Sequence, residues 1–436
     1  MRIRDFGPVY DALMTSPQGT DSAARTGVRG GGAIAVAMGV MNVATYGFTM
    51  VAARWLGPQN YGAFAALMGL LLVVGVVQLG LQATGARRIA SSPGDVHEIE
   101  RSVLRVSYGS ALALGALCLA FTPLINSTLK LESIPTAVLV AVSAVPMTVM
   151  GGQAGVLQGE RRWKELALVY LANGLPRLVI GTALVLWHPT EFAAMLGVTV
   201  AQLAPVAVGW FALRRGREPV HPHEPQGGHG GRAVLVEMAH NSHALLAFFA
   251  LSNIDVLVAR SVLAAHEAGL YAAGVIVVKA VLFLPQFVVV VAFPSMSSES
   301  ERRRVLLGSL GLVAAIGAAC TIGAEALSGV ALVFVGGHQY LPVEGQLWVF
   351  AVLGTLLSML QLLVYSVLAR QARYAVYAIW AAFLAVVLLG RLSGSFQELV
   401  RLVVLVDGCL FAVLLTVSLL SLRRPQQPAA EASVEG

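Results

Sequence analysis

The chain has 436 residues, of which 57% are hydrophobic and only 12% are charged, and its mean hydropathy is +0.76. Soluble domains carry about 25% charged residues, so this composition excludes a soluble globular protein and predicts a multi-pass membrane protein. The net charge of +6 lies mainly in short loops on one side of the predicted spans, which indicates membrane topology rather than binding of nucleic acid.

The chain divides into two sets of apolar runs, each run long enough to cross a hydrocarbon core of about 30 Å. Residues 1–30 come first and are polar and arginine-containing, which predicts a cytoplasmic tail rather than a cleavable signal peptide. The first lobe, 31–213, holds six predicted spans, at 33–53, 62–84, 106–124, 136–156, 166–187 and 192–213. The second lobe, 243–422, holds six more, at 243–263, 270–292, 305–325, 346–368, 374–390 and 398–420.

The segment 214–242 separates the lobes and contains the run RRGREPVHPHEPQGGHGGR. Proline, glycine and charge without apolar periodicity predict a flexible linker. Its histidines (His221, His223 and His229) do not indicate a metal site, because such a linker gives ligands no rigid frame. Most of the 29 Lys and Arg residues fall on the side that holds this linker, the N-terminal tail and a disordered tail at 423–436. The positive-inside rule therefore predicts that both termini are cytoplasmic.

Two short patterns recur at about half the chain length. Ala53-Arg54 and the YGAF of Tyr61–Phe64 are echoed by Ala259-Arg260 and the AGLY of Ala268–Tyr271. The segments 156–163 and 367–374 form a second echo, VLQGERRW and VLARQARY. Because each lobe has an even number of spans, a pseudo-twofold axis along the membrane normal is expected to relate the lobes. The predicted fold class is an all-α polytopic membrane protein with about 12 transmembrane helices in two six-helix lobes.

Four ionisable residues fall near the middle of predicted spans, where a charge needs a partner or a wet cavity. They are Arg177, which follows Pro176, and Asp255, Lys279 and Asp407. Across a predicted loop from Ala264 to Gly269, Asp255 and Lys279 would lie at similar depth and could pair. Structural pairing and cavity lining are both open, but the charges are not duplicated between the lobes, which favours a functional role.

Uncharged residues add two expectations. Gly151, Gly155 and Gly159 recur every four residues and predict a face where helices approach closely. Three amides either bond between helices or contact sugar: Asn173, Gln202 and Asn253. There is no phosphate-binding loop, HExxH or serine-triad signature, so the chain is not expected to be an enzyme or to bind a cofactor.

Several stretches resemble the polysaccharide-export branch of the multidrug/oligosaccharidyl-lipid/polysaccharide exporter superfamily. They are ARWLGPQNYGAF at 53–64, NIDVLVAR at 253–260, EAGLY at 267–271, FVGGHQY at 334–340, and the pattern of Lys279, Pro285 and Pro294. Two features depart from that branch, because Lys279 stands where an arginine is frequent and the linker is long and rich in proline and glycine.

The resemblance implies a transporter that flips a polyprenyl-pyrophosphate-linked oligosaccharide across the bacterial cytoplasmic membrane by alternating access of the two lobes. It implies cationic cavity residues, a proton or sodium as coupling ion, and a glycan polymerase and glycosyltransferases as partners. The candidate cavity residues are Arg177, Lys279, Asp255, Asp407, Arg54 and Arg260.

Two related functions remain as alternatives. A cation-coupled drug or small-molecule antiporter of the same superfamily would be expected to carry acidic residues deep in the first lobe, and none lies deep in a predicted span there. A lipid II flippase would be expected to carry two further helices after the twelfth. A purely structural membrane protein would not explain buried charges that are not duplicated between the lobes.

Overall fold

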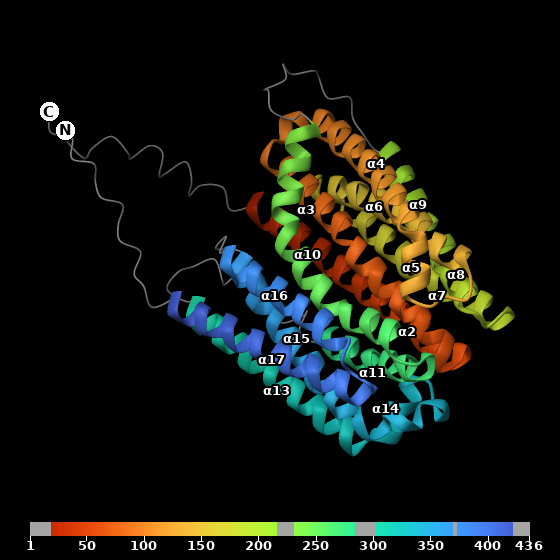
Figure 1. Ribbon diagram of the computed structural model, residues 1–436. Helices are drawn as coiled ribbons and strands as arrows, with labels where there is room; N and C mark the ends of the chain where they lie inside the picture. The colour runs from red at the N-terminus through yellow and green to blue at the C-terminus, as the bar shows by residue number, and fades with distance from the viewer. Residues whose placement is uncertain (1–18, 216–230, 284–301, 369–372, 422–436) are drawn as a thin grey trace.

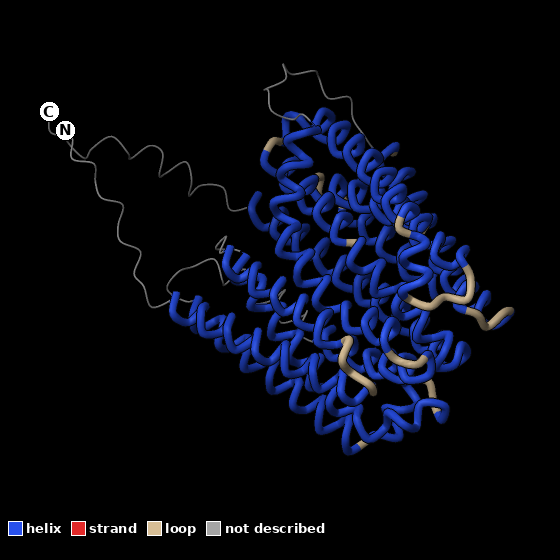
Figure 2. Tube along the Cα trace, viewed as in Figure 1, coloured by secondary structure: helices blue, strands red, loops and turns tan. Residues whose placement is uncertain are grey.

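A computed structural model describes residues 19–215, 231–283, 302–368 and 373–421. Every regular element in these segments is a helix, and Figure 2 shows how short the joining loops are. This confirms the predicted all-α class. The predicted C-terminal tail, most of the linker, and Pro285 and Pro294 lie outside the described residues.

The first lobe begins inside the predicted N-terminal tail, because its first helix starts at Gly19. Its helices are α2 (Gly19–Val74), α3 (Val76–Ser91), α4 (Val96–Ala120), α5 (Thr122–Thr128), α6 (Ile134–Gly159), α7 (Trp163–Trp187), α8 (Glu191–Ala201) and α9 (Leu203–Arg214), with the short 3-10 helix η1 (Pro93–Asp95) before α4.

The second lobe begins inside the predicted linker, at Gly231. Its described helices are α10 (Gly231–Val262), α11 (Ala265–Phe283), α13 (Arg302–Ala326), α14 (Ser328–Val335), η3 (His338–Gln346), α15 (Leu347–Leu368), α16 (Arg373–Gly390) and α17 (Phe396–Ser421).

Among the described residues, 10 helical stretches are long and apolar enough to cross a membrane. One of them, Gly32–Ser91, has 60 residues, far more than the roughly 20 that one crossing needs. It bends at Gly57 and supplies the first two predicted spans. A shorter apolar helix, Ala375–Gly390, occupies the place of the eleventh span. The twelve predicted crossings are therefore accounted for.

The predicted loop between the first two spans is wrong, because the chain turns sharply at one residue. Gly57 takes φ 70° and ψ 168°, and Pro58 begins the next helical stretch. Glycine reaches this φ without a steric penalty, and the fixed φ of proline suits a first helical turn. Residues 53–56 and 58–64 consequently stay helical on both sides of the bend.

The bundle has two ends. At the linker end, the last turn of α3 meets the start of α10 through an ion pair of Arg88 with Glu237, 2.7 Å from Nε to Oε2. At the far end, Arg260 near the close of α10 contacts the chain after α5. In Figure 1, α10 (green) starts beside α3 and α4 and ends beside α11, so it runs along the boundary between the lobes.

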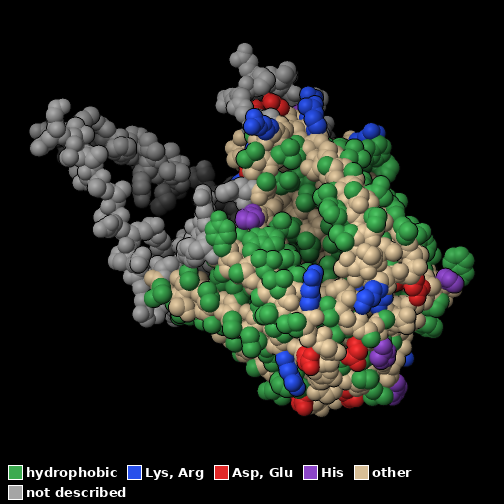
Figure 3. All heavy atoms as spheres, viewed as in Figure 1, with side chains coloured by type: hydrophobic (Ala, Val, Ile, Leu, Met, Phe, Trp, Pro, Cys, Tyr) green, Lys and Arg blue, Asp and Glu red, His purple; other side chains and the backbone are tan. Residues whose placement is uncertain are grey.

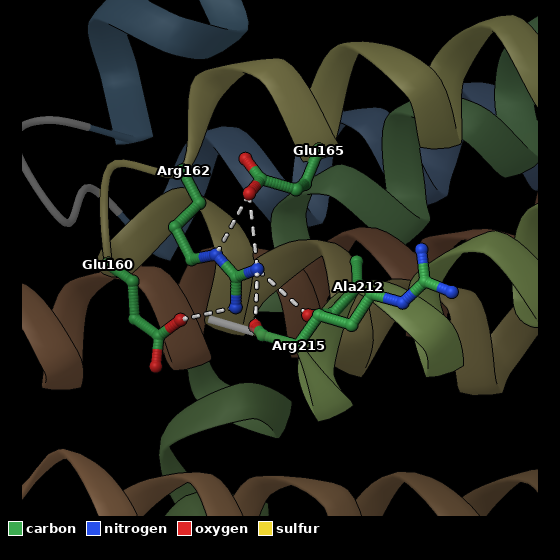
Figure 4. A network of polar contacts seen from close by, with 5 residues as sticks. All are labelled: Glu160, Arg162, Glu165, Ala212 and Arg215. Carbon is green, nitrogen blue, oxygen red and sulfur yellow. Dashed lines mark hydrogen bonds and ion pairs between the residues drawn. The ribbon is translucent and has the colours of Figure 1, made fainter. Parts of the chain in front are cut away.

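The turn between α6 and α7 is fixed at the linker end by one arginine (Figure 4). Arg162 Nη2 donates to the carbonyl oxygens of Ala212, at 2.8 Å, and Arg215, at 3.0 Å, at the end of α9. The same guanidinium pairs with Glu165 at 3.1 Å and lies 3.6 Å from Glu160. The sixth crossing is thereby tied to the middle of its own lobe.

The predicted close-packing face of α6 is confirmed. A Cβ on Gly155 would lie 2.7 Å from the carbonyl oxygen of Gln82, and one on Gly159 would lie 2.6 Å from Ile89 Cβ. A Cβ on Gly151 would meet the backbone of Gln78. The small residues therefore let α6 and α3 approach at backbone distance.

Candidate functional site

Arg177 lies on the buried face of α7, directly after Pro176, and is 8% exposed. Gly174 and Gly181 flank it, and both pack on α2: a Cβ on Gly174 would lie 2.6 Å from Met41 Cα. Among the described residues, its Nε has no hydrogen-bond partner and its guanidinium has no ion pair. An almost fully buried cation therefore sits in the first lobe without a counter-ion of its own.

A neighbouring helix is interrupted at the depth of Arg177. A Cβ on Gly197 of α8 would lie 2.6 Å from Gly181 Cα, so these two residues of antiparallel helices face each other. Four residues along each helix from this contact lead to Arg177 on α7 and to Ala201 on α8, next to the break between α8 and α9 at Gln202. Gln202 Oε1 is buried without a partner among the described residues, and Pro176 removes a helical donor from α7. Gln202 Oε1 is therefore an unpaired acceptor near this depth within the described part of the chain.

A row of uncharged polar side chains leads from Arg177 toward the linker end. Tyr170, Asn173 and Arg177 are spaced by three and four residues, so they share a face of α7. Gln82 Nε2 donates to the Tyr170 hydroxyl at 2.7 Å and to Gln158 Oε1 at 2.9 Å. Asn173 Nδ2 contacts Met41 Sδ at 3.4 Å, while its Oδ1 is buried and unpaired within the described part of the chain. We call Gln82, Gln158, Tyr170 and Asn173 the amide row.

The half-buried cation of the second lobe is held differently. Lys279 Nζ donates to the carbonyl oxygen of Ser252 at 3.1 Å and to Asn253 Oδ1 at 3.0 Å. Asp255 Oδ2 instead accepts from the Tyr271 hydroxyl at 2.8 Å. Charge–charge attraction links Asp255 and Lys279, but the described residues contain no ion pair between them.

The predicted matching depth of Asp255 and Lys279 is therefore wrong, and the loop explains why. The turn between α10 and α11 consists of 263–264, not 264–269. Asp255 lies seven residues before Val262, whereas Lys279 lies fourteen after Ala265, so the lysine sits deeper and reaches the turn of α10 that precedes Asp255.

Asp407 of α17 joins Asp255 in this lobe. It is 1% exposed, and one carboxyl oxygen of each aspartate is buried with no hydrogen-bond partner among the described residues. Electrostatic repulsion couples the two carboxyl groups, and Tyr271 lies within electrostatic range of both. Two buried acids beside one phenol can hold a proton or a small cation between them.

Arg260 and Arg54 do not join these groups, because both lie at the far end. Arg260 is 3% exposed, and its guanidinium donates to the carbonyl oxygens of Leu129 at 2.8 Å, Lys130 at 3.1 Å and Gln59 at 3.2 Å. The Arg54 side chain is exposed, and its carbonyl oxygen accepts from Gln339 Nε2 at 2.7 Å. Arg260 thus joins α10 to the first lobe through backbone acceptors.

The lobes meet closely at the far end. A Cβ on Gly62 would lie 2.9 Å from the backbone nitrogen of Gly269, and one on Gly269 would collide with the backbone of Pro58. The Tyr340 hydroxyl also donates to the carbonyl oxygen of Ala53 at 2.8 Å. Gly62 and Gly269 occupy equivalent places in the repeated sequence, so the two copies of one motif pack on each other.

The linker end is joined by exposed and half-buried charges. Glu237 of α10 pairs with both Arg87 and Arg88 of α3. Burial alone would raise the pKa of the Glu237 carboxyl, but the hydrogen bonds from the two arginines outweigh it and hold that pKa below its ordinary value. In Figure 3, charged side chains gather toward the two ends, the band between them is mostly hydrophobic, and the surface is hollowed beside α10.

Sequence reasoning found Arg177, Asn173 and Gln202 but missed Gln82, Gln158 and Tyr170. One signal was available, because Gln78 and Gln82 lie four residues apart in an apolar run and so share a helix face. Their partners on α6 and α7 could not be read from spacing, since they come from helices distant in sequence.

The chain was compared with known proteins. Residues 28–300 match the family model described as polysaccharide biosynthesis protein. A search of curated protein sequences gave no match.

Three solved structures are similar along most of the chain. An inward-facing multidrug resistance MATE transporter of the MOP superfamily has a TM-score of 0.65 at 11% identity, over 88% of this chain and 94% of its own. A eukaryotic MATE transporter has a TM-score of 0.60 at 12% identity, over 90% and 96%. A MOP transporter from Pyrococcus furiosus Vc1, described as having a binding pocket of reverse polarity, has 0.50 at 12% identity, over 89% and 94%. At these identities the likeness establishes the fold.

The family match covers more than half of the chain, so this protein belongs to the family described as polysaccharide biosynthesis protein. Its fold is similar to that of MATE transporters, and its described residues include helices long and apolar enough to cross a membrane.

Proposed function

We propose that this member of the polysaccharide biosynthesis protein family flips a polyprenyl-pyrophosphate-linked oligosaccharide from the cytoplasmic to the outer leaflet of a bacterial plasma membrane. Arg177 carries the proposal, because it is a buried cation with no counter-ion among the described residues. A guanidinium binds phosphate oxygens in a bidentate manner, and a pyrophosphate supplies the missing negative charge.

In this proposal the linker end is cytoplasmic, as the distribution of Lys and Arg favours. The far end is closed by the Gly62–Gly269 contact, by Arg260 and by Tyr340, so substrate enters from the linker end. Rocking of the lobes against each other then opens the far end, which is how parallel-repeat transporters alternate access.

The coupling ion belongs to the second lobe. Asp255 and Asp407 each offer a buried carboxyl oxygen without a partner among the described residues, and both lie near Tyr271. A proton or sodium ion bound there would relieve the repulsion between the carboxylates, and its release would restore it. Lys279 keeps its hydrogen bonds to Ser252 and Asn253, and its positive charge acts on the nearby Asp255 carboxylate. A glycan polymerase and glycosyltransferases are the expected partners on either side of the transport step.

A cation-coupled antiporter of small molecules is the second candidate, and the Asp255–Asp407 pair is the observation that favours it. In that case Arg177 would have no anionic ligand to bind.

Reconstitution separates the candidates. The purified protein in liposomes should move a fluorescent undecaprenyl-pyrophosphate-linked oligosaccharide between leaflets, measured by loss of fluorescence to a membrane-impermeant reductant. Lipid II and an organic cation are tested in parallel, with and without a proton or sodium gradient. Gradient-dependent uptake of the organic cation, with no movement of the glycolipid, would overturn the proposal. Faster movement of lipid II than of the oligosaccharide would reassign the substrate.

A further inference from the structure

The amide row lies on the linker side of Arg177 and along the same face of α7. Seven residues separate Tyr170 from Arg177, which is about 10 Å along a helix. A ligand whose phosphates reach Arg177 from the linker end therefore lays its next chemical groups against Asn173 and then Tyr170. On the function proposed above, those groups are sugars.

The hydrogen bonds within the row leave open positions. Gln82 Nε2 donates both of its protons, to Gln158 and Tyr170, and this leaves Gln82 Oε1 as an acceptor. The Tyr170 hydroxyl accepts that bond and keeps its own proton to donate. The bond to Gln158 uses its Oε1 and leaves its Nε2 as a donor. Asn173 Oδ1 is an acceptor with no partner among the described residues. The row thus presents donors and acceptors side by side, which is what a sugar hydroxyl needs.

The charge of the row restricts the sugar. Its four side chains are uncharged, and Arg177 is the one cation at its inner end. The arginines at the mouth, Arg87 and Arg88, are already paired with Glu237. A uronic acid laid along the row would enter a low-dielectric site with no cation of its own, which is strongly unfavourable.

We propose that the amide row is a binding site for the hydroxyl groups of an uncharged glycan, which it holds while Arg177 binds the phosphates of the same molecule. The proposal rests on the function proposed above and adds the class of sugar. The competing explanation is that the row only joins α3, α6 and α7. That explanation leaves Asn173 Oδ1 buried without a hydrogen-bond partner among the described residues, which is unfavourable.

The test uses the full chain in lipid nanodiscs and three lipids: undecaprenyl pyrophosphate, the same lipid with a neutral tetrasaccharide, and the same lipid with one uronic acid in that tetrasaccharide. The variants are Tyr170→Phe and Asn173→Leu, and the control is Tyr108→Phe, which changes a tyrosine that is 46% exposed on α4. Equilibrium affinity and thermal stability are measured for each.

We expect the wild type to bind the neutral glycolipid more tightly than either other lipid. Each row variant should lose about tenfold in affinity for it, as expected for one lost hydrogen bond with an unpaired partner, and should bind the sugar-free lipid as before. The control should bind all three lipids like the wild type. Unchanged affinity of both variants for the neutral glycolipid, or a wild type that prefers the uronic acid, overturns the assignment. If the wild type binds none of the three lipids, the proposed function itself falls.

Discussion

Arg177 in the first lobe and Lys279 in the second are cations near the middle of predicted spans, and their surroundings differ. Lys279 in the second lobe donates to Ser252 and Asn253 and lies near an acid, whereas Arg177 in the first lobe has no described partner. Both deep acids, Asp255 and Asp407, also belong to the second lobe. The two lobes thus differ: the cation of the second lobe has hydrogen-bond partners and a nearby acid, and that of the first has no partner among the described residues. On the function proposed above, this difference favours the first lobe for the anionic substrate and the second for the coupling ion.

The largest effect is expected from Arg177. Arg177→Ala removes the mid-span charge that is proposed to meet the pyrophosphate, and burying that group unpaired costs several kcal/mol, so flipping should fall to the background of empty liposomes. Arg177→Lys should keep a cation but lose bidentate binding, with flipping reduced about tenfold. Rates are normalised to folded protein in the same liposomes. Full activity of Arg177→Ala would show that the two lobes do not differ in this way.

Substitution of Lys279 tests whether the cation of the second lobe contributes to stability. Lys279→Met leaves Asn253 Oδ1 and the nearby Asp255 without their cation, and such a loss typically costs about 3 kcal/mol or more of folding free energy. We expect a clear drop in melting temperature, partly recovered by adding Asp255→Asn. A variant that stays as stable as the wild type but no longer binds the lipid-linked pyrophosphate would move Lys279 into the substrate site.

The twelve crossings could be predicted from the sequence because apolar length alone determines them, and the close approach of α6 to α3 because small residues recur at Gly151, Gly155 and Gly159. The turns could not be placed as well. The bend at Gly57 and the two-residue turn at 263–264 depend on single backbone conformations inside apolar sequence, where periodicity gives no boundary.

The site was predicted in part for the same reason. Arg177 stands out as a charge in an apolar run, so its depth follows directly from the sequence. Lys279 bonds to Ser252 and Asn253 in place of Asp255 because the turn between α10 and α11 lies at 263–264. The sequence predicts that this turn ends several residues later. The amide row depends on contacts between α3, α6 and α7, and glutamine in a span gives no indication of which helix it faces.

Gly62 and Gly269 occupy equivalent positions in the two lobes and contact each other, so a substitution here tests how the lobes meet. Gly269→Ala places a methyl group against the backbone of Pro58, which cannot move without shifting the bend at Gly57. We expect the free energy of unfolding to fall by about 1–3 kcal/mol. We also expect a cysteine introduced at the far end to be labelled in the variant and protected in the otherwise wild-type protein. Gly323→Ala in α13 is the matched control, since a Cβ there meets nothing within 4 Å. Equal behaviour of the two variants would mean that the lobes do not close at this contact.

The smallest effect is expected at Glu237, where the linker ends of the two lobes are joined. The pKa of its carboxyl lies below the ordinary value, so the pairing stabilises the fold fully above about pH 4.3. That contribution is lost as the pH falls further, through the folded-state pKa. Because Arg87 is largely exposed, Glu237→Gln should cost at most about 1 kcal/mol at neutral pH. A melting-temperature difference that persists unchanged in acid would contradict this account.

Arg162 has a consequence for the order in which the protein is made. Its hydrogen bonds to Ala212 and Arg215 involve residues that leave the ribosome before any part of α10. The end of the sixth crossing can therefore form its hydrogen bonds with the turn between α6 and α7 while the second lobe is still being synthesised. This is consistent with domains folding as units from the N-terminus. Helices α3 and α2 of the completed first lobe then form the surface against which α10 packs as it inserts. The long linker delays the synthesis of α10 and so gives the first lobe time to fold.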